Sequence, residues 1–140
     1  MATIRGAVAS DSEAVFVLTK AFSTSFEPEP EAFARSFEHL LSDDGALLLV
    51  ADEDGSVCAY LLGFVHETLF ANGPVAWVEE LMVAENKRRE GVGASLIREF
   101  EAWAGQRGAR LVALATRRAS EFYVARGYEE SAAYFRKLLG

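Results

Sequence analysis

In the first half of the chain, apolar positions change from helical spacing to continuous runs. Between residues 11 and 22, and again from about Pro30, they recur every three or four positions, which predicts two amphipathic helices. Beyond these, apolar runs bounded by Asp, Asn and Gly predict strands at residues 46–51, 57–70 and 75–83. Because the turns between these strands are short, neighbouring strands must pair antiparallel.

The second half alternates between helix and strand. The pattern predicts a helix from about Gly91 to Gln106, a buried strand at 109–115 and a short helix at 118–126. A right-handed crossover through the first helix makes strand 109–115 parallel to strand 75–83. The remaining tail, residues 128–139, suits a terminal strand or hairpin.

A short strand at residues 3–9 completes the predicted order β-α-α-β-β-β-α-β-α-β. This is a mixed α/β sheet whose first half is antiparallel. The 140 residues are enough to bury a core, so we expect a single domain over residues 1–140.

Composition excludes several classes of function. The net charge of −7 argues against general nucleic-acid binding, because a phosphate backbone would be repelled. No signal peptide is recognisable, and no apolar stretch approaches the roughly 18–20 residues of a membrane span. We therefore expect a cytoplasmic protein without a membrane partner. Cys58 suits a small core residue, and His39 and His66 lack partners spaced like metal ligands, so we expect no metal.

The candidate chemistry begins where the helix after strand 75–83 starts, at Arg88-Arg89-Glu90-Gly91-Val92-Gly93-Ala94. The first N–H groups of a helix have no internal partner, and two glycines let an anion approach them closely. With the basic side chains of Lys87, Arg88 and Arg89 beside them, these groups indicate a phosphate or pyrophosphate cradle. The alternative is an ordinary glycine-containing helix cap with a solvated basic face.

Two familiar phosphate motifs do not fit this segment. No GxxxxGK run followed by Ser or Thr exists, and Leu96 stands where a dinucleotide fingerprint needs its third glycine. The run Arg88-x-x-Gly91-x-Gly93 instead resembles the pyrophosphate signature of the GCN5-related N-acetyltransferase (GNAT) superfamily. A second match, Ala119-x-x-Phe122-Tyr123-x-x-x-Gly127-Tyr128, resembles another element of that family. The order of elements matches over nearly the whole chain.

This resemblance implies a GNAT fold, a mixed sheet of six to seven strands flanked by about four helices, with acetyl-CoA as cosubstrate. Family members also commonly form dimers, so we expect a homodimer. Thr116 stands where related sequences often carry an Asn that contacts the coenzyme. The residues expected to bind the cosubstrate are Leu81, Met82, Val83, Arg88, Arg89, Glu90, Gly91, Val92, Gly93, Ala94, Thr116 and Phe122.

Three residues are candidates for proton transfer. Glu79 and Glu80 interrupt an apolar strand, and one of them must face water or a cavity, because adjacent strand residues point to opposite faces. A carboxylate there could deprotonate the attacking amine. Glu79 matches the position of a proposed base in several family members. The resemblance makes Tyr123 the candidate general acid for the leaving thiolate, although an aromatic packing role is equally compatible with Phe122-Tyr123.

The main hypothesis is an acetyl-CoA-dependent N-acetyltransferase acting on a primary amine of a small molecule or peptide. The alternative is a non-catalytic acyl-CoA-binding or regulatory module of the same fold. Both need Arg88, Gly91 and Gly93, but only the enzyme needs Tyr123 and a base. For the acceptor, Glu27, Glu29 and Glu31 hint at a cationic amine, although solvated acids explain them equally well.

Overall fold

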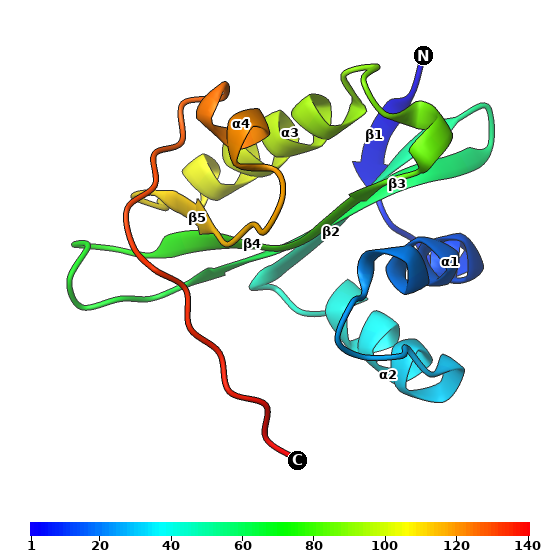
Figure 1. Ribbon diagram of the computed structural model, residues 1–140, viewed down its shortest axis with the longest axis horizontal. Coiled ribbons are helices and arrows are strands. Elements are labelled where there is room, and N and C mark those ends of the chain that lie inside the picture. The colour runs from blue at the N-terminus through cyan, green and yellow to red at the C-terminus, as the bar shows by residue number, and fades with distance from the viewer.

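A single five-stranded sheet runs through the centre of the protein (Figure 1). The computed structural model describes residues 1–140. Neighbouring strands follow chain order: β1 (Thr3–Gly6), β2 (Ala46–Glu53), β3 (Ser56–His66), β4 (Val75–Val83) and β5 (Val112–Leu114). The first three pairings are antiparallel, and β4 and β5 are parallel. The predicted antiparallel unit and the parallel crossover are both confirmed.

The helices cover both faces of the sheet (Figure 1). On one face lie α1 (Ser12–Phe22) and α2 (Pro30–Leu41), and on the other lie α3 (Val92–Gln106) and α4 (Ser120–Val124). Two short 3₁₀ turns, Ala9–Asp11 and Glu85–Lys87, complete the regular structure. No helix is long and apolar enough to cross a membrane.

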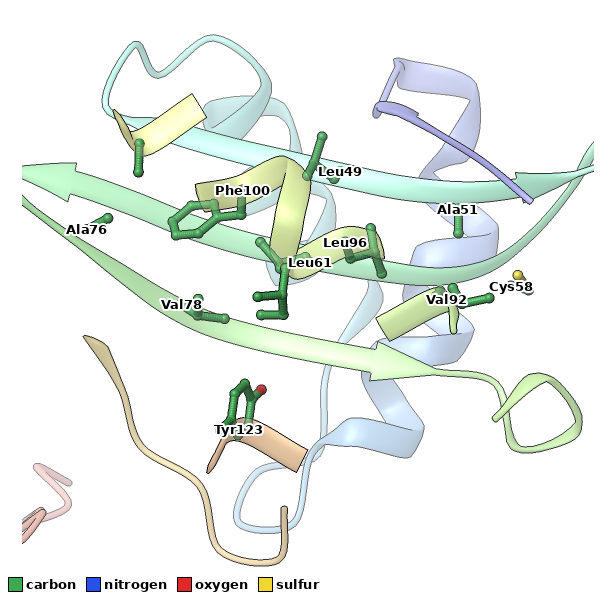
Figure 2. Close-up of a cluster of buried hydrophobic side chains, with 13 residues drawn as sticks. Leu49, Ala51, Cys58, Leu61, Ala76, Val78, Val92, Leu96, Phe100 and Tyr123 are labelled. Atoms are coloured by element: carbon green, nitrogen blue, oxygen red, sulfur yellow. The ribbon is translucent and has the colours of Figure 1, made fainter. Parts of the chain in front are cut away.

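Each face of the sheet carries its own buried cluster. Leu61 and its neighbours pack under α3 and α4, in the cluster drawn in Figure 2. Tyr60 and Leu62, one position to either side in β3, instead pack against α1 and α2. The period-two alternation of a strand therefore divides β3 between the two cores.

A β-bulge in β4 interrupts this alternation next to the candidate base residues. Gly63 of β3 faces Val78, but the next pair joins Leu62 to Glu80, so Glu79 is the extra residue. The Phe100 ring packs against the Gly63 backbone, and a Cβ atom on Gly63 would overlap the Cε1 and Cζ atoms of that ring. A glycine is therefore required opposite the bulge.

The C-terminal tail departs from the prediction. No strand or hairpin forms after α4, so the sheet has five strands rather than six or seven. The tail apolar residues occur as the pairs Tyr134-Phe135 and Leu138-Leu139, which do not alternate as a half-buried strand requires, and all four are exposed. In Figure 1 the tail leaves α4 and ends away from the helices and the sheet.

Several predicted elements are also shorter than their apolar runs. Strand β3 ends at His66 rather than residue 70, β5 covers only Val112–Leu114, and α4 only Ser120–Val124. In the first case the reason is visible in the loop that follows, where Leu69 and Phe70 are exposed and pair with no neighbour. Apolar composition alone overestimated these lengths.

Candidate active site

The edge of β4 is open along its C-terminal half. Strand β5 pairs with β4 only from Ala76 to Val78, whereas β4 continues to Val83. The Ala84 N–H donates to the Cys58 carbonyl of β3 at 2.8 Å. Because successive backbone groups alternate in direction along a strand, the N–H and C=O groups of Leu81 and Val83 point away from β3. They lie on the open edge, where an extended amide-rich ligand could pair with them.

The segment leading into α3 presents a run of free backbone donors. The N–H groups of six consecutive residues, Arg89 to Ala94, donate to no acceptor within the chain. Arg89 (φ 67°) and Gly91 (φ 83°) adopt left-handed conformations, and alternation of this kind turns successive N–H groups inward as an anion-binding nest. The positive end of the α3 dipole adds to this potential. The predicted phosphate cradle thus has the donors that it needs.

The three basic side chains beside the cradle differ in whether they already have a partner within the chain. Lys87 Nζ forms an ion pair with Glu53 Oε1 at 2.7 Å, and this partner raises the lysine pKa. Arg88 Nε donates to the Val83 carbonyl at 3.1 Å, on the open edge of β4. Arg89 is exposed and has no acceptor in the chain. The expected set of three phosphate donors is therefore reduced, because Lys87 joins the cradle to β2.

Phe122 and Thr116 have packing and turn roles in the structure. A Cβ atom on Gly93 would lie 3.3 Å from Phe122 Cζ, so Gly93 allows α4 to pack closely on the start of α3. Thr116 Oγ1 accepts the Ala119 N–H at 3.0 Å in the turn that leads into α4. Binding of the cosubstrate by Phe122 and Thr116 stays a prediction.

Tyr123 is buried in α4, with its ring directed toward β4 (Figure 2). The Phe122 and Tyr128 rings meet it edge-on, at centroid distances of 4.9 and 5.7 Å. Its hydroxyl makes no hydrogen bond within the chain, and burial raises its pKa. The phenol is therefore protonated at neutral pH and free to donate. Packing and proton donation are both compatible with this position.

The bulge separates the two adjacent glutamates. Glu79 is exposed and pairs with no residue of β3. Glu80 is partly buried on the face of α1 and α2, where its Oε1 accepts the Tyr60 hydroxyl at 2.6 Å. Burial raises the pKa of Glu80, and the Tyr60 hydrogen bond opposes that rise. The Glu79 carboxylate is therefore exposed to solvent, whereas the Glu80 carboxylate is partly buried and held by a hydrogen bond.

Glu80 lies where two hollows meet between the sheet and helices α1 and α2. The inner hollow, about 80 Å³, is mainly apolar, and the outer hollow, about 290 Å³, opens at the segment between the helices. Thr19, Phe33, Ser36 and Glu80 line both. The sequence analysis missed Tyr60, although a lone hydroxyl in an aliphatic strand run was a signal for it.

Comparisons with known proteins agree with this architecture. Residues 14–128 match the model of the "Acetyltransferase (GNAT) family". An aminoglycoside N(6')-acetyltransferase type 1 from Acinetobacter genomosp. 13 is 30% identical over 120 residues, covering 79% of this chain and 82% of that protein. The chain therefore belongs to the GNAT acetyltransferase family, and its class is N-acetyltransferase.

Solved structures show how closely the fold is shared. A transcriptional regulator from Bacillus halodurans has a TM-score of 0.90 at 22% identity, covering 99% of this chain and 100% of the other. The acetyltransferase AAC(6')-Iy, solved with the bisubstrate analogue CoA-S-monomethyl-acetylneamine, has a TM-score of 0.83 at 23% identity, covering 99% of both chains. At these identities the likeness shows the fold alone.

Proposed function

We propose that this protein transfers the acetyl group of acetyl-CoA to a primary amine by direct attack of the amine on the thioester. The observation that carries this proposal is the run of six free N–H groups before and within the first turn of α3, next to the open edge of β4. A pyrophosphate bound by these N–H groups and an amide-rich pantetheine arm paired with the open edge of β4 match one extended ligand of the coenzyme A type.

Three groups of the chain divide the chemistry. Glu80, directly or through water, removes a proton from the alkylammonium and leaves a neutral amine. The Leu81 N–H donates to the thioester oxygen, on which negative charge develops as the C–N bond forms. As the C–S bond breaks, Tyr123 protonates the departing thiolate, and the second amine proton restores the Tyr123 hydroxyl.

In this scheme Glu80 replaces Glu79 as the preferred base. Glu80 faces the hollows beside β4, whereas the Glu79 side chain is exposed on the bulge. Tyr60 holds the Glu80 carboxylate in place through the 2.6 Å hydrogen bond. We regard Tyr60 as a positioning residue.

The acceptor proposal favours a small molecule over a peptide. It is supported by the curated relative, which is named for acetylation of aminoglycosides. We further propose that the protein works in the cytoplasm, as a homodimer.

The direct test is release of free coenzyme A when purified protein is mixed with acetyl-CoA and a panel of amines. Free thiol is followed with a chromogenic reagent, and the amine product is identified by mass spectrometry. We expect turnover with at least one small amine and none without an amine. Tight binding of coenzyme A without turnover on any amine would instead support a non-catalytic binding module.

A further inference from the structure

The segment that leads from β4 into α3 has little contact with the rest of the protein. Of residues 85–91, only Lys87 is partly buried, and the others are exposed. None of these residues belongs to a buried cluster or packs against one. Apolar burial therefore does not order this segment, although it carries the first three of the free N–H donors of the cradle, those of residues 89–91.

Lys87 holds the segment to a strand that is not its neighbour. Its Nζ donates to both carboxylate oxygens of Glu53, at 2.7 and 3.3 Å. Glu53 ends β2, and β3 lies between β2 and β4, so the ion pair reaches across β3. Arg88, by contrast, bonds to Val83 of the adjoining strand. The Lys87–Glu53 pair is therefore the one side-chain bond that joins residues 85–91 to a part of the fold beyond β4.

Direct contact with a phosphate is the alternative role for Lys87. The pair raises the pKa of Lys87 and lowers that of Glu53, so both partners are charged at neutral pH. The Met1 ammonium, 4.0 Å from Glu53 and fully exposed, is the only other cation bridged to this carboxylate. The two roles differ in what loss of Glu53 does. It would release Lys87 to bind a phosphate more strongly, or it would detach the segment and weaken the cradle.

We propose that Lys87 and Glu53 are positioning residues for the cosubstrate, because their ion pair holds the free N–H donors of the cradle where they can bind the pyrophosphate. This inference rests on the proposed binding of acetyl-CoA and adds residues that act without touching either substrate. Without the pair, binding must also order the segment, and that cost lowers affinity. The loss is limited by the strength of the pair, which for a partly exposed ion pair corresponds to roughly a two- to fivefold change in Kd.

A double-mutant cycle tests the pair. Calorimetry measures the Kd of coenzyme A for the native protein, Lys87→Met, Glu53→Met and the combined variant. We expect each single variant to bind roughly two- to fivefold more weakly. The combined variant should bind no more weakly than either single variant, because all three lack the same ion pair. Lys87→Arg keeps a cation that can reach Glu53 and should bind nearly as the native protein does.

Steady-state kinetics separate positioning of the cradle from a general loss of structure. In the Lys87→Met and Glu53→Met variants, KM for acetyl-CoA should rise in parallel with the Kd of coenzyme A. Both kcat and the KM for acetyl-pantetheine, which lacks the pyrophosphate, should stay at the native values. A loss of structure would change all of these quantities.

The control is Asp52→Asn, one position earlier in β2. It also removes a negative charge and an ion pair, that of Asp52 with Arg5 at 3.0 Å, but its partner lies in β1 and not in the cradle segment. It should bind coenzyme A as the native protein does, and an equal loss of affinity in this control would overturn the inference.

Two other results would also overturn the inference. Weaker binding in Lys87→Met alone, with native or tighter binding in Glu53→Met, would assign Lys87 to a direct phosphate contact. Native affinity in both single variants would show that the pair does not support the cradle. Absence of coenzyme A binding by the native protein would instead contradict the proposed function itself.

Discussion

Glu80 and Tyr123 approach β4 from opposite faces of the sheet. Glu80 belongs with the residues packed under α1 and α2, and Tyr123 with the cluster under α3 and α4. The proposed base and acid are therefore in separate environments, and each can be tuned without disturbing the other. Burial raises both pKa values, which favours a protonated phenol but opposes ionisation of the carboxyl.

The first prediction concerns the Tyr123 hydroxyl. Tyr123→Phe keeps the ring and its edge-on contacts with Phe122 and Tyr128, and removes only the proton donor. We expect near-normal acetyl-CoA binding by calorimetry and a fall in kcat of roughly 10²–10⁴-fold, the usual range for general acid–base groups. Unchanged turnover on a good acceptor would assign Tyr123 to packing and leave the proton to water.

The second prediction concerns the stability cost of Glu80. Because burial raises its pKa in the folded protein, Glu80 contributes stability below its unfolded pKa that is lost as pH rises through the folded pKa. Glu80→Gln keeps an acceptor for Tyr60 and cannot ionise. We expect the variant to gain thermal stability over the native protein at neutral pH, with a smaller gain in acid, and to lose turnover.

Melting temperatures from pH 4 to 8 measure this difference. Glu99→Gln is the control, because that side chain is exposed on α3, on the opposite face of the sheet from Glu80, and the substitution should leave the melting temperature unchanged. A Glu80→Gln variant with native stability at every pH would show that the buried carboxylate carries no such cost.

At the scale of residues, the sequence predicted part of the candidate site. It predicted that Glu79 and Glu80 point in different directions, because alternation is local. It could not predict which one faces α1 and α2, because that depends on a bulge opposite Gly63, and Phe100 of another element packs against that glycine. The hypothesis that favoured Glu79 followed the family pattern and lacked this contact.

At the scale of elements, the bulge reverses which residues of β4 point to each face of the sheet, so the pattern after the bulge is opposite to the pattern before it. Ala76 and Val78 lie in the cluster under α3, and after the bulge Leu81 and Val83 pack against that cluster. Without the extra residue Glu80 would share the face of Ala76 and Val78, since alternation has period two. The bulge therefore places Glu80, the proposed base, on the face covered by α1 and α2.

The third prediction is that Gly63→Ala destabilises the fold. Its methyl group would overlap the Phe100 ring, which is fully buried and cannot move aside. Overpacking of this kind typically lowers the free energy of unfolding by about 1–3 kcal/mol. Urea unfolding measures the change. Gly105→Ala, near the end of α3 with no atom near the new methyl, should instead stabilise by about 0.5–1 kcal/mol.

The fourth prediction tests the cradle at the start of α3. Gly91 has φ 83° and open space around it, so Gly91→Val disturbs the nest by backbone strain and not by packing. We expect KM for acetyl-CoA to rise roughly tenfold or more, because hydrogen bonds to charged groups are lost. The variant should use acetyl-pantetheine, which lacks the pyrophosphate, as efficiently as the native protein does.

Gly108→Val provides the matched control at the opposite end of α3. Gly108 has φ 81° and no neighbouring atom, so the substitution introduces similar strain away from the cradle. If both variants lose acetyl-CoA and acetyl-pantetheine to the same extent, the effect is general destabilisation and the cradle assignment is wrong.

At the scale of the whole molecule, the order of elements follows from local patterns and the tail does not. Amphipathic spacing and short turns predicted the antiparallel strands and the parallel crossover, since each depends on neighbouring segments. The tail carries four exposed apolar residues, Tyr134, Phe135, Leu138 and Leu139, and has no partner in its own chain. A strand needs a neighbouring segment to pair with, and the apolar residues of the tail do not indicate one.

The fifth prediction is that the tail holds the proposed homodimer together. Beyond Tyr128, whose hydroxyl donates to Glu101, every tail residue is exposed. Exposed apolar residues and the free outer edge of β5 favour pairing with a second copy. We expect a dimer by light scattering, and a monomer of native fold and circular dichroism after deletion of residues 129–140.

A native protein with a monomeric mass at every concentration would remove this idea. A truncated protein that stays dimeric would show that the dimer forms through another surface.

Because the bulge turns Glu80 toward α1 and α2, the two proposed ligand sites lie on different sides of the sheet, and this affects the order in which ligands bind. The cradle lies at the start of α3, and the hollow proposed for the acceptor opens between α1 and α2, on the other side of the sheet. Neither ligand has to pass through the site of the other. We expect random-order kinetics with both ligands bound together before transfer, and a compound that links them covalently should reach around the free edge of β4 and occupy both entrances at once.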